Sequence, residues 1–126
     1  MTTPERWADQ ARYDIDTAKA MLEAKPFPYV LFMRQQAIEK ALKAIVIQVT
    51  GKMAPRIHSL VKLGELAQLK LSAEQEKFYA ELVSYYIGSR YPEDLLAMSK
   101  RVSHQKAKEA LDKSEEEIQW LLSLLK

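Results

Sequence analysis

The sequence predicts an all-α protein, an antiparallel up-and-down bundle of four to five helices in one domain spanning residues 1–126. Three observations predict this fold. Apolar residues recur at spacings of three, four and seven along several long stretches. No stretch alternates apolar and polar residues with the period of a strand. Short breaks rich in Pro or Gly separate the stretches, and a chain of 126 residues can form one hydrophobic core but not two.

Residues 29–49, YVLFMRQQAIEKALKAIVIQV, are predicted to form the central helix. Its apolar stripe consists of Leu31, Ile38, Leu42, Ile45 and Val49. Small residues beside this stripe allow a neighbouring helix to approach closely, and they are Ala37, Ala41 and Ala44. A second face carries Gln36, Glu39, Lys40 and Lys43. Two interpretations of this polar face stay open: a solvated surface with pairs Gln36–Lys40 and Glu39–Lys43, or a functional site.

The first helix is predicted from Thr3-Pro4, a capping hydroxyl followed by a proline suited to a first turn, to about residue 24. Its apolar face consists of Trp7, Ala11, Ile15, Ala18 and Leu22. The segment KPFP, residues 25–28, interrupts the helix because proline is excluded from helix interiors. So short a connection makes the first two helices antiparallel neighbours.

Three further helical stretches follow the central helix, which is expected to end at Thr50-Gly51. A short helix begins at His58-Ser59, with Leu60, Leu63 and Ala67 on one face. Ser72 and Gln75 fit a capping box that starts a fourth helix, whose buried side is Phe78, Leu82 and Tyr86 and which breaks at Gly88 and Pro92.

The last long helix is predicted after Ser103, and before it Glu93-Asp94 begin a short helical turn that includes Leu95, Leu96 and Met98. The apolar face of the last helix consists of Ala107, Leu111, Ser114, Ile118, Leu121, Leu122 and Leu125. Shared stripe positions predict that eight side chains are buried: Trp7, Ile15, Ile38, Leu42, Ile45, Leu82, Ile118 and Leu122.

Composition excludes several classes of function. The chain has no Cys, its two histidines, His58 and His104, lie far apart, and we expect neither a metal site nor a cofactor. Its three Gly form no phosphate-binding loop, and no Gly-x-Ser-x-Gly elbow is present. No apolar run is long enough for a membrane span or a signal core, so we expect a cytoplasmic protein. The net charge is only +2, so any basic surface for nucleic acid would have to be local.

The stretch YYIGSRYPED, residues 85–94, is the most unusual in composition. Arg90 offers a planar fork of donors that suits phosphate or carboxylate. Tyr86 and Tyr91 offer aromatic faces and hydroxyls for a ligand. These side chains could instead be structural, with the tyrosines in the core and Arg90 paired to Glu39 or to an acid on the first helix. As a cluster facing the polar side of the central helix, they favour a pocket.

Four segments together resemble the HEPN domain family, in its minimal form often encoded beside a small nucleotidyltransferase. ARYDIDTAKAML, residues 11–22, is similar to the first-helix pattern, and MRQQAIEKALKAIV, residues 33–46, to the signature second helix. HSLVKL, residues 58–63, resembles a His-x-Leu-x-x-Leu segment. YYIGSRYP, residues 85–92, resembles the Tyr-x-x-x-Arg-Tyr-Pro motif of one branch. The positions that match are Gln36, Glu39, Lys43, His58, Tyr86, Arg90 and Tyr91.

The resemblance implies a helical homodimer that binds a nucleotide or RNA, often within a toxin–antitoxin pair. Many family members are metal-independent ribonucleases with an Arg followed, after four to six residues, by a His. Here 13 residues separate Arg90 from the next histidine, His104. We therefore expect little or no ribonuclease activity.

Three functional hypotheses follow. The first is a homodimer that binds a nucleotide or a nucleotidyltransferase partner, with Lys43 and Arg90 on phosphate, Tyr86 or Tyr91 on a base, Glu39 orienting Arg90, and Gln36 on the same face. The second is a ribonuclease with a degenerate active site formed by His58 and Arg90. The third is a helical assembly module whose polar cluster is purely structural.

Overall fold

This computed structural model describes residues 3–24, 27–88 and 103–126. For residues 24, 27–29, 31 and 83–88 it describes the backbone but not the side chains. In the described part of the chain the helices are α1 (Pro4–Ala24), α2 (Phe27–Thr50), α3 (Leu60–Leu66), α4 (Ala73–Gly88) and α6 (His104–Ser123), and there is no strand. The predicted all-α bundle is confirmed.

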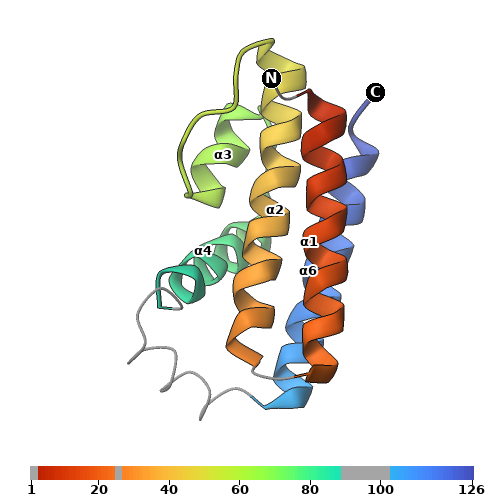
Figure 1. Ribbon diagram of the computed structural model, residues 1–126. Helices are drawn as coiled ribbons and strands as arrows, with labels where there is room; N and C mark the ends of the chain where they lie inside the picture. Colours follow the sequence, from red (N-terminus) through yellow and green to blue (C-terminus); the bar gives the residue numbers. More distant parts are fainter. Residues whose placement is uncertain (1–2, 25–26, 89–102) are drawn as a thin grey trace.

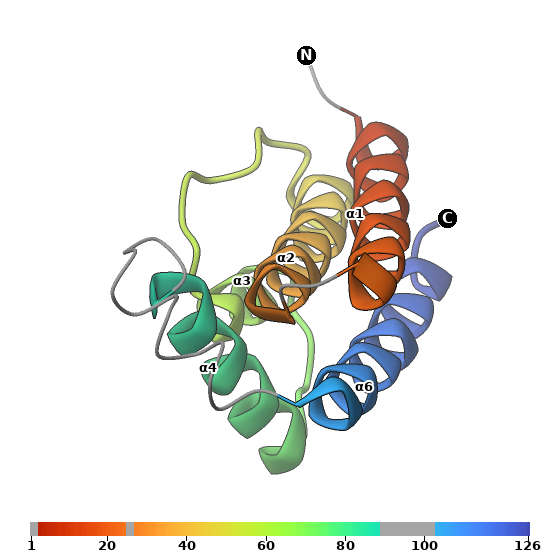
Figure 2. The same ribbon diagram turned by 60° about the horizontal axis from the view of Figure 1, so that its bottom comes forward.

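Helix α2 is the element against which the others pack. It contacts α1, α3, α4 and α6. Figures 1 and 2 show α1, α2 and α6 side by side as long rods, with α3 and α4 on the side of α2 away from α1 and with α4 crossing α2 obliquely. The two ends of the described chain lie at the same end of the bundle (Figure 1). Because α2 is in contact with each of these helices, its side chains on different faces meet different neighbours.

The apolar face of α2 forms the centre of the core. Ile38 and Leu42 are fully buried, and Ile45 is 2% exposed. Among the other residues predicted to be buried, Ile15, Leu82 and Ile118 are buried as expected. Trp7 and Leu122 are only partly buried, because Trp7 lies in the first turn of α1 and Leu122 lies at the edge of the apolar face of α6.

One end of the predicted apolar stripe differs from its centre. Val49 was expected on the apolar stripe, but at the end of α2 it is 39% exposed, because it lies beyond the part of the helix that its neighbours cover. The side chain of Leu31, at the other end of the stripe, lies outside the described residues.

Most of the predicted helix boundaries are confirmed. Gly51 follows α2 with a φ of 70°, the left-handed conformation that glycine adopts without strain. Ser59 and Ser103 cap α3 and α6, each accepting a hydrogen bond from a backbone N–H three residues later. Ser72 and Gln75 form the reciprocal pair of a capping box at the start of α4, at 2.9 and 3.0 Å.

One boundary was wrong, and one predicted element lies outside the described residues. Helix α2 begins at Phe27 rather than at residue 29, so Pro28 occupies its first turn, where a backbone N–H is not needed for helical hydrogen bonding. The short turn expected from residue 93 falls in the segment 89–102, outside the described residues. Within the described helices, none combines the length and apolarity that a membrane span requires.

Candidate functional site

A buried carboxylate, that of Glu39, is the centre of the polar cluster on α2. Glu39 is 5% exposed. Its Oε1 atom accepts hydrogen bonds from Gln35 Nε2 at 3.1 Å and from His58 Nδ1 at 2.9 Å. Its Oε2 atom lies 3.0 Å from Lys43 Nζ. A buried charge is stable only when it is paired and hydrogen-bonded, and this carboxylate meets both conditions.

Local sequence spacing explains how these four side chains meet. Gln35, Glu39 and Lys43 are four residues apart on α2, so their side chains form one row along the helix. His58 reaches the row from the loop between α2 and α3. The loop is fixed directly before and after His58, because Ile57 packs against the core and Ser59 caps α3. The sequence therefore positions the imidazole beside Glu39 without a long flexible connection.

Lys43 is a buried cation rather than a solvent-exposed one. The residue is 7% exposed, and its Nζ atom lies 5.5 Å from the centre of the Trp7 ring on α1. A cation over an aromatic face is stabilised by the ring's negative face, most of all when water is excluded. The ammonium of Lys43 is thus held between the Glu39 carboxylate and the Trp7 indole.

The solvated-face interpretation of α2 is only partly correct. The pair Glu39–Lys43 forms as predicted, but it is buried. Lys40 forms an ion pair with Asp14 of α1, at 2.6 Å, where an intrahelical pair with Gln36 was expected. A neighbouring helix offers Lys40 a charged partner, and a carboxylate attracts an ammonium more strongly than an amide does. Gln36 is half-buried.

His58 is the member of the cluster with the most exposed side chain, at 52%. An ionised carboxylate only accepts hydrogen bonds, so the short contact to Glu39 places a hydrogen on Nδ1 of the imidazole. In the neutral ring Nε2 is then the acceptor nitrogen, and in the charged ring both nitrogens donate. In its charged form an imidazole oriented this way can donate its Nε2–H to an anion, and in its neutral form its Nε2 can accept a proton.

Sequence reasoning missed Gln35 and Trp7. Gln35 is fully buried, and its Oε1 atom has no hydrogen-bond partner among the described residues, although its Nε2 donates to Glu39. An unpaired buried carbonyl costs about 1–3 kcal/mol. The spacing of Gln35, Glu39 and Lys43 was visible in the sequence, but a row that is exposed and a row that is buried have the same spacing.

Three predicted site residues are not placed. The side chain of Tyr86 and all of Arg90 and Tyr91 lie outside the described residues. The expected approach of Arg90 to Glu39 therefore stays a prediction. Of the seven predicted residues, the structure brings together Glu39, Lys43 and His58.

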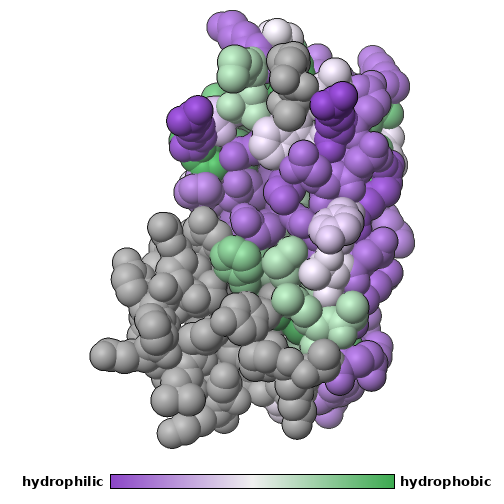
Figure 3. Space-filling model, viewed as in Figure 1, coloured by the Kyte–Doolittle hydropathy of each residue, from purple (hydrophilic) through white to green (hydrophobic). Residues whose placement is uncertain are grey.

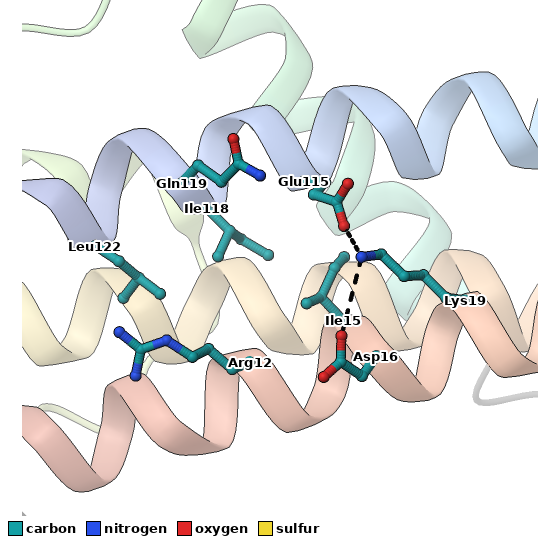
Figure 4. Close-up of a pocket in the computed structure, with 8 residues that line it drawn as sticks. All are labelled: Arg12, Ile15, Asp16, Lys19, Glu115, Ile118, Gln119 and Leu122. Carbon is teal, nitrogen blue, oxygen red and sulfur yellow. Dashed lines mark ion pairs between the residues drawn. The ribbon is translucent and has the colours of Figure 1, made fainter.

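A separate surface pocket of about 250 Å³ lies between α1 and α6. Figure 4 shows Lys19 of α1 directed at Glu115 of α6 and at Asp16, with Ile15 and Ile118 between the two helices. The hydrogen bond to Glu115 raises the pKa of Lys19. Lys19 thus pairs with both carboxylates, and the residues that line the pocket include none of the predicted site residues. We therefore place the candidate site at Glu39.

No three His, Cys, Asp or Glu side chains are grouped closely enough to hold a metal ion, as far as the described residues extend. The donor set around Glu39 contains an ammonium and an amide N–H, which do not bind metals. The donors and the imidazole of this cluster are of the kinds that suit anion binding and proton exchange.

Because the ion pair between Glu39 and Lys43 is buried, removal of the Lys43 ammonium should strongly destabilise the fold. Lys43→Met keeps the length of the side chain but leaves the Glu39 carboxylate buried without its ammonium, and we expect a loss of about 3–5 kcal/mol in the free energy of unfolding. The matched control is Lys108→Met on α6, which removes the cation of an exposed pair with Asp112 at the same four-residue spacing. Its loss should stay below about 1 kcal/mol. Equal losses in urea denaturation would show that Lys43 is not buried.

Comparisons with known proteins agree with this fold. The family model for the HEPN domain matches residues 4–124. The chain is similar to the crystal structure of TT1696 from Thermus thermophilus, with 25% sequence identity and a TM-score of 0.82, over 99% of this chain and 100% of that one. Among proteins with curated descriptions, none matches. Since the family model covers nearly the whole sequence, the chain belongs to the HEPN domain family.

Proposed function

We propose that the protein is a HEPN-type homodimer that binds a phosphate-bearing ligand, a nucleotide or RNA, at the cluster around Glu39. The observation that carries this proposal is the contact of 2.9 Å between His58 Nδ1 and Glu39 Oε1. It orients a half-exposed imidazole, with Nε2 on the side of the ring away from Glu39, at the rim of a buried polar cluster. Membership of the HEPN family supports a nucleotide-related or ribonuclease-like function.

The burial of Lys43 modifies the roles expected within the cluster. Its ammonium is enclosed by Glu39 and Trp7, so His58 is the better candidate to meet a phosphate first. Arg90, Tyr86 and Tyr91 stay candidates for the rest of the pocket, on the resemblance of residues 85–92 to the Tyr-x-x-x-Arg-Tyr-Pro branch. Because the minimal form of the family is often encoded beside a small nucleotidyltransferase, we propose such a protein as the partner in a toxin–antitoxin pair.

His58→Ala should weaken ligand binding while the fold persists, because the ring is half exposed and the buried Glu39 keeps Lys43 and Gln35 as donors. We expect a loss of roughly 10- to 100-fold in affinity, the value of a charge-assisted hydrogen bond of about 1.5–3 kcal/mol. The probes are the four ribonucleoside monophosphates and inorganic phosphate, titrated calorimetrically.

The chain supplies a matched control for this experiment. His104→Ala removes the other histidine, which is exposed at the start of α6, and should leave the affinity unchanged. If every probe binds His58→Ala as tightly as the wild type, or if none binds the wild type, the proposed site is wrong.

We propose metal-independent cleavage of RNA as a second function. The contact between Glu39 and His58 favours it, because an imidazole bound to a carboxylate is suited to proton transfer. The family spacing between Arg and His is absent after Arg90, so binding without cleavage is our first expectation. Purified protein incubated with RNA in chelator should leave it intact. Cleavage that disappears in His58→Ala and persists in His104→Ala would establish the second function instead.

A homodimer is proposed because apolar side chains remain exposed on the single chain. Tyr13 is 72% exposed and Trp120 is 36% exposed. Figure 3 shows further apolar side chains gathered over the lower part of the α1–α2 face. Large exposed apolar areas usually mark contacts between proteins. Light scattering should give the mass of two chains, and the mass of one chain over a wide concentration range would exclude the dimer.

A further inference from the structure

The segment from Thr50 to Gly64 carries basic side chains and no acidic ones. Its sequence is TGKMAPRIHSLVKLG, 15 residues without Asp or Glu. They carry four basic side chains, all exposed: Lys52, Arg56, His58 and Lys62. His58 contacts Glu39, and Lys62 lies 3.6 Å from Glu65 in an exposed pair. The loop between α2 and α3, together with the first turn of α3, therefore forms a local basic surface on a chain whose net charge is only +2.

The loop that carries this basic surface is anchored at several points. At its start Gly51 N donates to Ile47 O at 2.8 Å, and Lys52 N donates to Thr50 Oγ1 at 3.2 Å. Near its end Ile57 packs on the core and His58 binds Glu39. Figures 1 and 2 show the loop standing out at the edge of the bundle between α2 and α3. A preorganised basic loop binds a polyanion with less loss of conformational entropy than a flexible one.

We propose that this basic loop, residues 51–58, binds the backbone of single-stranded RNA and leads the strand to His58. The inference rests on the proposed function, because it assigns a polymer to the same site. Lys52 and Arg56 are four residues apart, a span of at most about 14 Å for an extended chain. Two cations spaced along a loop in this way suit successive phosphates of a strand better than a single phosphate.

Two further features favour RNA over an acidic protein surface. Met53 lies between the two cations in the sequence and is 80% exposed, so an apolar side chain is available to contact an unstacked base. His58, at the end of the same loop, is the residue already proposed to meet phosphate. Backbone phosphates at regular spacing with bases between them match this order of cation, apolar side chain, cation and imidazole.

The test is the salt dependence of binding. A fluorescent single-stranded RNA of about 12 nucleotides, a length within the usual site sizes for single strands, is titrated with the protein at several salt concentrations, and the fluorescence anisotropy gives the affinity. Each phosphate contact contributes about 0.7 to the slope of log affinity against log salt. Lys52→Gln/Arg56→Gln should therefore reduce the slope by about 1.4. Both side chains are exposed, so the melting temperature should not change.

The control variant is Lys106→Gln/Lys108→Gln, which removes the same net charge from exposed positions on α6. Its slope should equal that of the wild type. Equal slopes for all three proteins would overturn the inference and leave the proposed function intact. RNA binding that depends on the loop but survives in His58→Ala would support the loop and remove the proposed site. Polyglutamate bound as tightly as RNA, with the same loop dependence, would overturn the assignment to RNA.

Discussion

The buried carboxylate of Glu39 is the constraint on which the rest of the site depends. A carboxylate 5% exposed in the interior of a helical bundle is unstable unless donors surround it. Gln35 and Lys43 supply two donors from the same helix, and His58 supplies the third from a different segment. The charge therefore links the loop before α3 to α2. It also fixes which nitrogen of the imidazole carries hydrogen.

One helix serves the core and the site at once. The apolar face of α2 buries Ile38 and Leu42 against the other helices, and this packing makes the helix a rigid support. The row that contains Glu39 lies on another face of the same helix. Trp7 of α1 covers Lys43, so the contact between α1 and α2 also closes the cluster on that side. Rigid packing on one face thus maintains the geometry of the polar face.

The sequence was sufficient for most boundaries of the described helices, because apolar periodicity and capping residues are local signals. Ser72 with Gln75, Ser103 and Gly51 mark their boundaries correctly. The pairing of Glu39 with Lys43 also followed from their spacing. Burial of that pair did not follow, because it depends on Trp7 and on the loop carrying His58, which are distant in sequence. Likewise, Lys40 was assigned an intrahelical partner, since the register of Asp14 against α2 is a tertiary property.

The choice between Gln35 and Gln36 illustrates the same limit. Adjacent residues on a helix differ by about 100° in direction, so only one of them faces Glu39. Spacings of three and four are both compatible with contact, and the pattern therefore supported either residue equally. The structure selects Gln35, which is fully buried, whereas Gln36 is half-buried.

The central claim is that the buried Glu39 carboxylate orients His58. It is tested most directly by nitrogen-15 NMR of the histidine rings in basic buffer, where an imidazole is neutral. The account predicts that His58 carries its hydrogen on Nδ1 in the wild-type protein. In Glu39→Leu the hydrogen should move to Nε2, the nitrogen favoured by a free histidine in water. A wild-type His58 with its hydrogen on Nε2 would contradict the account, since Glu39 would then receive no hydrogen bond from that ring.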